Sequence, residues 1–287
     1  MISVLIHRSI GLGDVIMATP IVRRFLENPD ARVFFSTFYP HVFDGLFGDR
    51  VEASPTVQQE HDFDCHFDLD NCYEKSPWLH VTDAYMMEAF GDIGDSFLKQ
   101  PAIRLEKPPI GLDEEPDIVV VHAARTWRSR TLPEKTWANV GTQLSLSKLK
   151  PFAVGKRSDI LPSGCIDLRG RLTLHQVAGL IAGARCFLGS DSGLLHVAGC
   201  TATPIVGVFT CARPERRLPY RNGILGGNCF PVVPALACVG CLERPPMPRT
   251  TDLCLRGDFA CASMVSADAI MATVHEAAAV GERTAAA

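Results

Sequence analysis

The stretch from Arg185 to Phe209 reads RCFLGSDSGLLHVAGCTATPIVGVF, and the expected fold follows from it. A short apolar run ends at Gly189, a polar elbow follows over 190–193, and an apolar helical segment leads to a second apolar run over 204–209. This order predicts strand, turn, helix and strand. The elbow would then lie at the carboxyl end of a parallel strand, where open α/β sheets bind their ligands.

The elbow itself allows two interpretations. A turn that enters a helix can present unpaired backbone N–H groups to an anion. Alternatively, Asp191 or Ser192 is only the N-cap of that helix, and His196 is a satisfied surface histidine. The spacing of these residues is compatible with both, so function has to be argued from the rest of the chain.

Composition limits the classes of protein to which this chain can belong. Its 287 residues are 47% hydrophobic and 21% charged, which is enough for a sizeable core and for about two domains. A net charge of −4 supplies no global basic field for nucleic acid, although a local basic patch is compatible with it. The first residues are too short an apolar run for a signal peptide, and no run approaches the roughly 18 residues of a transmembrane segment. We therefore expect a cytoplasmic protein.

The first half of the chain begins with a predicted buried strand over 4–7, a loop over 9–14 and an amphipathic helix over 15–26. Gly11 and Gly13 permit a tight turn, and Asp14 lies at the helix start. A dinucleotide fingerprint would need a third glycine where Ile16 stands, which disfavours an NAD site.

Further elements are expected between residues 32 and 116. A second strand is predicted over 32–37, and acidic and apolar residues alternate over 61–70 as in a half-buried strand or, alternatively, a metal site. The segment 76–103 is expected to be helical and irregular, and 106–116 to be the domain linker. The core candidates in the helical segment are Trp78, Tyr85, Met86, Met87 and Phe90.

The second half opens with a buried strand over 117–122. The loop that follows carries Arg125, Arg128 and Arg130, whose guanidinium groups suit phosphate oxygens, although a solvated basic loop would look the same. Helices over 133–144 and 174–184 alternate with strands over 151–155 and 165–168. This alternation predicts an α/β fold with a second doubly wound domain, so that two domains face a cleft.

Three motifs resemble those of glycosyltransferase family 9, the ADP-heptose-dependent heptosyltransferases. They are GLGDVIMATP at 11–20, GSDSGLLHVA at 189–198, and His122-Ala123-Ala124 with Leu132-Pro133 and Trp137. The resemblance implies a GT-B fold of two Rossmann-like domains, an acceptor-side domain over 1–110 and a nucleotide-sugar domain over 111–287. It extends from Met1 to about Phe209 and implies a bacterial enzyme that inverts the anomeric centre.

The same resemblance assigns roles to individual residues. It implies that Asp14 is the general base for the acceptor hydroxyl, with Gly11 and Gly13 beside it on the acceptor side. The residues implied on the donor side, where ADP-heptose or a related ADP-sugar would bind, are Arg130, with Arg125 and Arg128 as alternatives, and Asp191, Ser192, Gly193 and His196. Arginines and a helix amino terminus can stabilise the leaving diphosphate, so the chemistry fits without a catalytic metal.

After Pro234 the chain becomes rich in cysteine, within a segment that we bound at 229–261. Cys238 and Cys241 form a CxxC pair, and Cys254 and Cys261 follow after twelve and six residues. This spacing is typical of a structural zinc or iron site, but reduced thiols would also account for it. Cys229 is an alternative ligand. Similar cysteines in the heptosyltransferases that modify autotransporter proteins would imply iron, and they favour a protein acceptor over a glycan such as the lipopolysaccharide core.

Other classes of function are compatible with parts of the sequence. A non-catalytic GT-B-like protein that binds a nucleotide or glycan is the main alternative, although Asp14 disfavours it. A nucleotide-sugar epimerase or oxidoreductase would need the missing third glycine, and a metal-organised interaction module would leave the stretch 185–209 unexplained. The acceptor, the metal and the oligomeric state, a homo-oligomer among the options, stay open at this stage.

Overall fold

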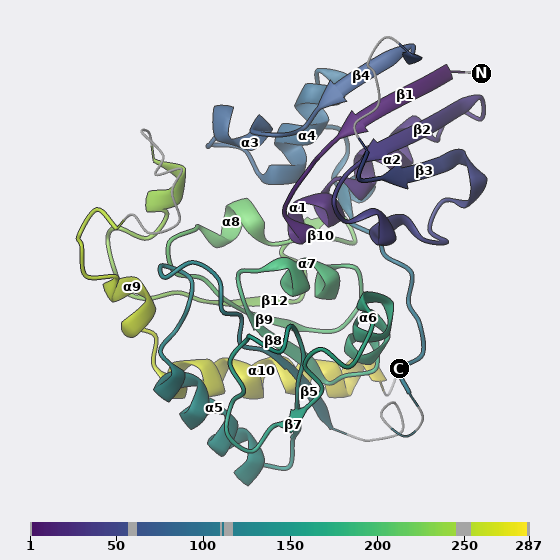
Figure 1. The fold of residues 1–287 in the computed structure, drawn as a ribbon. Helices are drawn as coiled ribbons and strands as arrows, with labels where there is room; N and C mark the ends of the chain where they lie inside the picture. The colour runs from purple at the N-terminus through teal and green to yellow at the C-terminus, as the bar shows by residue number, and fades with distance from the viewer. Residues whose placement is uncertain (1, 57–61, 110, 112–116, 245–253, 286–287) are drawn as a thin grey trace.

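The computed structural model describes residues 2–56, 62–109, 111, 117–244 and 254–285, and two parallel sheets organise them (Figure 1). The first sheet has the strand order β3-β2-β1-β4. Its strands are β1 (Ile2–His7), β2 (Ala31–Ser36), β3 (Val51–Ser54) and β4 (Cys65–Asp68). Its helices are α1 (Leu12–Met17), α2 (Thr19–Phe25), α3 (Cys72–Lys75) and α4 (Val81–Phe90), with short 3-10 turns at Pro40–Phe43, Gly48–Arg50 and Ser96–Lys99.

The second sheet has the order β12-β9-β8-β5-β6-β7, and every pairing in it is parallel. Its strands are β5 (Ile118–His122), β6 (Lys150–Ala153), β7 (Ile166–Asp167), β8 (Cys186–Ser190), β9 (Ile205–Val208) and β12 (Cys229–Val232). A small hairpin joins β10 (Tyr220–Arg221) to β11 (Ile224–Leu225). The connecting helices are α5 (Glu134–Leu146), α6 (Leu174–Ala182), α7 (Gly193–Gly199) and α8 (Pro214–Arg217).

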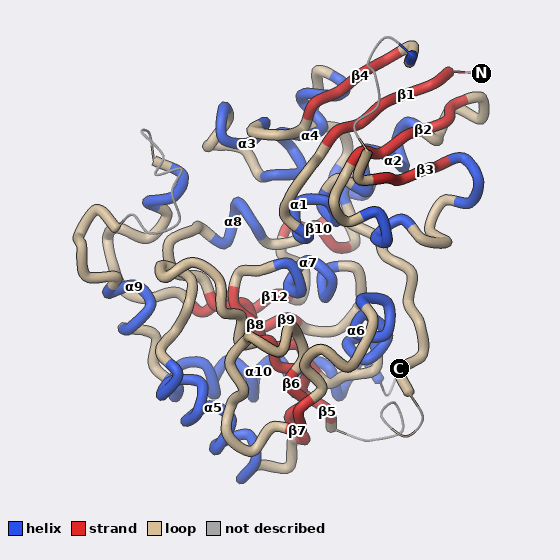
Figure 2. Tube along the Cα trace, in the orientation of Figure 1, coloured by secondary structure: helices blue, strands red, loops and turns tan. Residues whose placement is uncertain are grey.

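The carboxy-terminal segment returns to the second sheet. After a 3-10 turn at Cys241–Glu243 and the short α9 (Ala260–Ser263), α10 (Ala267–Ala285) runs beneath the sheet, as the yellow helix in Figure 1 shows. Its buried residues, such as Ile270 and Val274, join an apolar cluster with Trp137 of α5 and Val206 of β9. Each of the two sheets is therefore built from its own part of the chain, and α10 packs against the second sheet, which comes from the same part (Figure 2).

The two halves contact each other through α1 and α7. A Cβ on Gly13 would overlap the ring of His196, and a Cβ on Gly193 would lie 3.0 Å from Leu12. One apolar cluster contains core residues of both halves, such as Val15 and Leu195. The boundary at residues 110 and 111 stays a prediction, because much of the expected linker lies outside the described residues.

The expected helix over 15–26 is wrong in one respect, because two helices occupy this part of the chain. Pro20 has no N–H to donate to the carbonyl of Ile16, and the hydroxyl of Thr19 donates to that carbonyl instead, at 2.7 Å. Two of the five core candidates are also wrong. Trp78 is 64% exposed and Met87 is 42% exposed, whereas Tyr85 and Met86 are fully buried.

Candidate active site

A cavity of about 470 Å³ lies where the carboxyl ends of strands from both sheets meet. Loops that follow β1 and β4 line it from one side, and loops that follow β5 and β8 line it from the other. The polar and charged residues that line it are Arg8, Ser9, Asp14, Asp70, Asn71, Tyr73, Glu74, Thr126, Arg130, Asp191, Ser192, His196 and Arg217. Most of the site residues expected from the sequence are therefore brought together here.

Asp14 lies in the first turn of α1, with its carboxylate between two arginines. Arg8 donates to Oδ2 at 2.6 Å, and Arg217 lies 3.9 Å from Oδ1. Gly11 makes this position accessible, because it has a φ of 88° and a Cβ there would overlap the Asp14 carboxylate. Gly11 therefore has a steric reason for being glycine.

Arg8 links Asp14 to a second carboxylate. Its guanidinium donates to Asp70 at 2.9 Å, and Asp70 also accepts from the backbone N–H of Ser9 at 3.1 Å and from the Ser9 hydroxyl. Burial lowers the pKa of Arg8, but the charge of Asp14, the neighbouring tyrosines Tyr85 and Tyr73 and the hydrogen bond to Asp14 together raise it overall. Arg8 is therefore a permanent cation in the wall of the cavity.

Tyr73 and Arg217 complete this side of the cavity. The guanidinium groups of Arg217 and Arg8 lie 4.8 Å and 5.5 Å from the centre of the Tyr73 ring, and burial raises the pKa of Tyr73 to about 12. Among the described residues, Nε of the buried Arg217 has no hydrogen-bond partner. Sequence reasoning missed Arg8, Asp70, Tyr73 and Arg217. The position of Arg8 directly after a buried strand was the one available signal.

Of the three arginines in the loop after β5, Arg130 alone lines the cavity. It stacks on the Trp127 ring at 4.4 Å and lies 3.4 Å from Asp191. Arg125 instead pairs with Glu134 at 2.5 Å, and Arg128 lies 4.3 Å from the centre of the Phe259 ring. The geometry therefore distinguishes Arg130 from its two neighbours, which the sequence alone could not do.

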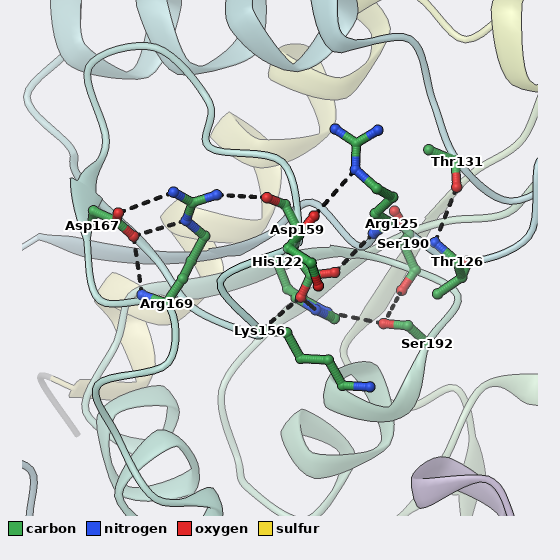
Figure 3. Close-up of polar contacts among 11 residues, drawn as sticks. His122, Arg125, Thr126, Thr131, Lys156, Asp159, Asp167, Arg169, Ser190 and Ser192 are labelled. Atoms are coloured by element: carbon green, nitrogen blue, oxygen red, sulfur yellow. Dashed lines mark hydrogen bonds and ion pairs between the residues drawn. The ribbon is translucent and has the colours of Figure 1, made fainter.

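His196 is not the surface histidine that one interpretation of the elbow expected. It is 4% exposed, and burial lowers its pKa to about 4, so the ring is neutral at physiological pH. Ser192 is the N-cap residue of α7 by position, but it does not cap the helix with its side chain. Its hydroxyl lies 3.0 Å from Nδ1 of His122 instead (Figure 3). Asp191 is buried beside Arg130.

The cysteine-rich segment lies next to the loop after β5. The thiol of Cys261 faces the Ser129 carbonyl at 3.8 Å, and that of Cys241 faces the Cys211 carbonyl at 4.0 Å. Burial, followed by the neighbouring thiols, raises the pKa of Cys241 and Cys261 to about 11. Cys211, Cys238 and Cys254 act on both thiols, and Cys241 also acts on Cys261.

Two cysteines differ from expectation. Cys211, which follows β9, is among the thiols that raise the pKa of Cys241 and Cys261, although sequence spacing did not single it out. Cys229 lies on β12, where its thiol faces the Gly227 carbonyl at 3.5 Å. It does not appear among the neighbours that raise the pKa of Cys241 or Cys261. The alternative in which Cys229 is a ligand is therefore unsupported.

The alternating stretch 61–70 forms only the four-residue strand β4 within its described part. Among the described residues, the potential metal ligands with atoms within 4.8 Å of one another are His7, Asp68 and Asp70. Asp70 is already paired with Arg8, and Asp64 accepts from Ser3. A metal site formed by the alternating acidic face is therefore not supported. The cysteine sulfurs of the described segments form no group that is equally tight.

A family model supports the motif resemblance. The model described as glycosyltransferase family 9 (heptosyltransferase) matches residues 79–226, which include the loops after β5 and β8. The chain belongs to glycosyltransferase family 9. A lipopolysaccharide core heptosyltransferase, OpsX of Haemophilus influenzae, is 34% identical over 56 residues, which span 20% of this chain and only 16% of that relative.

Solved structures of the family share the fold. The iron-containing dodecameric glycosyltransferase TibC of enterotoxigenic Escherichia coli has a TM-score of 0.77 at 15% identity, over 96% of this chain and 78% of TibC. A family 9 protein of Veillonella parvula has a TM-score of 0.72 at 12% identity, over 96% and 97% of the two chains. For E. coli ADP-heptose lipopolysaccharide heptosyltransferase II the TM-score is 0.67 at 13% identity, over 98% and 100%. These likenesses confirm an α/β fold with parallel sheets that matches the heptosyltransferases.

Proposed function

We propose that this protein is a glycosyltransferase that transfers a heptose or a related sugar from an ADP-sugar to a hydroxyl of a glycan or protein acceptor. One observation carries the proposal. The cavity places Asp14 of the first half opposite Arg130 and Asp191 of the second half. The proposed base and the proposed anion-binding groups thus lie on opposite sides of the space in which the sugar would pass from the diphosphate to the acceptor hydroxyl. One related TibC structure contains ADP-D-β-D-heptose, which supports the choice of donor.

In the proposed reaction the acceptor oxygen attacks the anomeric carbon while the bond from that carbon to the diphosphate oxygen breaks. Asp14 takes the proton of the acceptor hydroxyl as general base. Arg8 donates to Oδ2 of the Asp14 carboxylate. The other oxygen, Oδ1, is then on the side of Arg217 and the cavity. A single displacement of this kind inverts the anomeric centre.

The leaving diphosphate gains negative charge as the bond breaks. Arg130 and Arg217 both line the cavity, and fixed cations stabilise charge that develops in a site shielded from water. We therefore propose that the transfer step requires no catalytic metal. His196 and the buried Asp191 complete the donor side, with Gly193 providing close approach to Leu12.

The cysteine-rich segment suits a structural zinc or iron ion, and Cys254 is the residue that argues for it. Burial raises the pKa of its thiol, but hydrogen bonds from the backbone N–H groups of Phe259, Arg256, Gly257 and Asp258 lower it overall. These donors favour the thiolate, which is the form that binds metal. We propose Cys238, Cys241, Cys254 and Cys261 as ligands, and a metal there would order the segment that packs beside Arg128.

The acceptor and the setting are part of the same proposal. OpsX is a lipopolysaccharide core heptosyltransferase, and TibC is described as iron-containing and dodecameric. We infer a lipopolysaccharide core or a protein hydroxyl as acceptor, a bacterial cytoplasmic setting and a homo-oligomer as the assembly to test. No helix within the described residues is long and apolar enough to cross a membrane.

The proposal is tested by incubating the protein with ADP-, UDP- and GDP-sugars and measuring thermal shift and sugar release. We expect an ADP-sugar to stabilise the protein most, and ADP to be formed when an acceptor is added. Stabilisation by an ADP-sugar without any turnover would instead indicate a non-catalytic binding protein. Selective stabilisation by UDP- or GDP-sugars would contradict the proposed donor.

A further inference from the structure

The side chain of Arg217 is a buried cation that is not fully paired. It lines the cavity and is 6% exposed. Nε has no hydrogen-bond partner among the described residues, and the ion-pair contact of Nη1 with Oδ1 of Asp14 measures 3.9 Å, which is beyond hydrogen-bond distance. A guanidinium and a carboxylate that meet in a buried site usually form a short pair at about 2.7–2.9 Å. The structure thus keeps these two charged groups apart.

Tyr73 on α3 is the aromatic residue that contacts Arg217. Its ring centre lies 4.8 Å from Cζ of Arg217 and 5.5 Å from Cζ of Arg8. Burial raises the pKa of Tyr73 to about 12, so the phenol is neutral and offers the face of an aromatic ring. A cation is attracted to such a face, most strongly where water is excluded. The ring therefore competes with Asp14 for the guanidinium of Arg217.

The ring of Tyr73 is anchored in the first half of the molecule. It lies 6.2 Å, between ring centres, from the fully buried Tyr85 of α4. Its other cationic neighbour, Arg8, is fixed by hydrogen bonds to Asp14 at 2.6 Å and to Asp70 at 2.9 Å. The first half therefore determines where this ring stands.

The main chain beside Arg217 is also held by the first half. Arg217 is the last residue of α8, and the carbonyl of Leu218 accepts a hydrogen bond from Nε2 of His80 at 2.9 Å. The donor atom is fixed, because the backbone N–H of Thr82 donates to Nδ1 of the same ring at 3.1 Å and leaves the proton on Nε2. Arg217 belongs to the second half by sequence, but side chains of the first half set its position.

We propose that Tyr73 is a positioning residue whose ring holds Arg217 away from Asp14. The N–H groups of Arg217 then stay available for the leaving diphosphate, and Oδ1 of Asp14 stays available for the acceptor hydroxyl. The inference rests on the proposed function and deepens it. Tyr73 lies outside the three motifs and outside residues 79–226, which the family model matches.

Removal of the ring should let the two charges meet. With an aliphatic side chain in place of Tyr73, a movement of about 1 Å would bring Arg217 to the usual ion-pair distance from Asp14. One ion pair would then occupy both the anion-binding group and the base. A phenylalanine would keep the ring face and should therefore keep the two groups apart.

The direct test compares Tyr73→Leu with Tyr73→Phe, with ADP as the ligand in calorimetry. We expect Tyr73→Leu to weaken ADP by about 3- to 30-fold, because the ring no longer holds the guanidinium for the diphosphate. Tyr73→Phe should bind ADP as the wild type does. An equal loss in both variants would overturn the proposal, because the hydroxyl and not the ring would then be responsible.

A second comparison tests whether Asp14 captures Arg217. In an Asp14→Asn background there is no carboxylate to pair with the guanidinium, so Tyr73→Leu should cost much less ADP affinity there. In an Arg217→Met background Tyr73→Leu should cost none. An undiminished loss in either background would overturn the positioning role.

Tyr39→Leu is the matched control. Tyr39 is also a partly buried tyrosine of the first half and packs against the same apolar cluster, but its ring neighbour is His41 and it does not line the cavity. The variant should lose thermal stability without losing affinity for ADP. A loss of ADP affinity equal to that of Tyr73→Leu would overturn the proposal, because it would reflect general loosening of the first half.

Proton NMR of the ligand-free protein gives a readout that does not depend on the proposed function. Ring currents shield protons that lie over an aromatic face, so Nε–H of Arg217 should resonate upfield in the wild type and in Tyr73→Phe, and downfield in Tyr73→Leu. The same position in all three proteins would overturn the placement of Arg217 by the ring. If the wild type does not bind ADP, the proposed function fails, and this shift still decides whether Tyr73 holds Arg217.

Discussion

The carboxylate of Asp14 lies between two arginines, and this arrangement supports the proposed role of the residue as a general base. Arg8 approaches from its own half of the molecule and Arg217 from the other. A carboxylate in such a position is fixed in direction before any ligand binds. General-base catalysis requires this kind of placement within hydrogen-bond reach of the acceptor hydroxyl.

Asp14→Asn should therefore lower the transfer rate by roughly 10²- to 10⁴-fold while donor affinity stays close to that of the wild type. The amide keeps the shape of the side chain but cannot take a proton. Steady-state rates and calorimetric titration with ADP-heptose measure the two quantities. Asp92→Asn, which breaks the exposed pair with Arg24, is the control and should change neither. Wild-type turnover by the Asp14→Asn variant would reduce Asp14 to a structural residue.

Arg130→Ala should weaken ADP-heptose by about 10- to 100-fold, because it removes a charged donor from the cavity wall. Arg125→Ala and Arg128→Ala are its matched controls in the same loop. Their side chains contact Glu134 and Phe259, so their effects should be several-fold smaller. Calorimetry on the three variants decides the point. Equal losses would indicate a diffuse basic field instead of a specific phosphate ligand.

At the scale of elements, the packing of α1 on α7 brings the two halves of the site together. Glycines make this close approach feasible, because Gly13 faces His196 and Gly193 faces Leu12. Side chains larger than hydrogen at these two points would separate the helices. The same contact brings Asp14 and Asp191 to one cavity, so stability and the proposed catalysis depend on one interface.

Gly13→Ala should destabilise the protein by about 1–3 kcal/mol, because the added methyl group overlaps the buried His196 ring. Its control is Gly183→Ala at the end of α6, where the nearest atoms lie 3.9 Å from the added carbon and φ is −89°. Urea unfolding of both variants measures the difference. A Gly13→Ala protein as stable as the control would show that α1 and α7 are less tightly packed than the structure has them.

At the scale of the whole molecule, buried polar groups join the halves outside the cavity. His80 at the start of α4 is bonded to the Leu218 carbonyl at 2.9 Å, and Tyr220 donates to Asp83 at 2.9 Å. Lys99, itself buried, pairs with Asp83 at 2.8 Å. Such groups are costly to bury unless they stay paired, so they favour one arrangement of the two halves.

Stability should fall as pH decreases from about 6.5 toward 4. Burial lowers the folded-state pKa of His196 to about 4 and that of His80 to about 3, both from 6.5. The unfolded chain therefore binds protons that the folded protein excludes, which favours unfolding in acid. His196 alone accounts for about 3 kcal/mol of this effect. Urea unfolding at several pH values measures it, and His80→Gln should flatten the profile. A flat wild-type profile would contradict the burial of these rings as neutral groups.

Purified protein should carry about one zinc or iron ion per chain, measured by elemental analysis. Four thiolates suit either metal, and ferric thiolate absorbs in the visible whereas zinc does not. A chelator should lower thermal stability before it lowers the activity of the folded fraction. The Cys238→Ser/Cys241→Ser double variant should lose the metal, and Cys229→Ser should keep it. Absence of metal from freshly prepared protein would contradict the proposed site and would mean that the cysteines are ordinary reduced thiols.

Local patterns in the sequence were enough to predict the main alternation of strands and helices, but not short elements such as β3 and β12. Buried parallel strands such as 118–122 are continuous apolar runs, and glycine, proline and polar residues interrupt them where the chain turns. Local patterns also pointed to the loops that carry Asp14, Asp191 and the three arginines, because each loop follows such a strand, and the motif resemblance proposed the roles of these residues. Parallel sheets bring such loops to one edge of each sheet, but the packing of the two halves is what brings Asp14 to the same cavity as Arg130 and Asp191.

Only the tertiary structure decided which neighbours these residues have. Tyr73 and Arg217 lie far from Asp14 in the chain, Cys211 lies far from Cys254, and no local periodicity relates such pairs. The choice of Arg130 among three arginines depends on where a loop turns, and the loop is held by contacts with distant segments. Sequence patterns encode which face of an element is buried, whereas partners across the cavity are set when the two halves pack together.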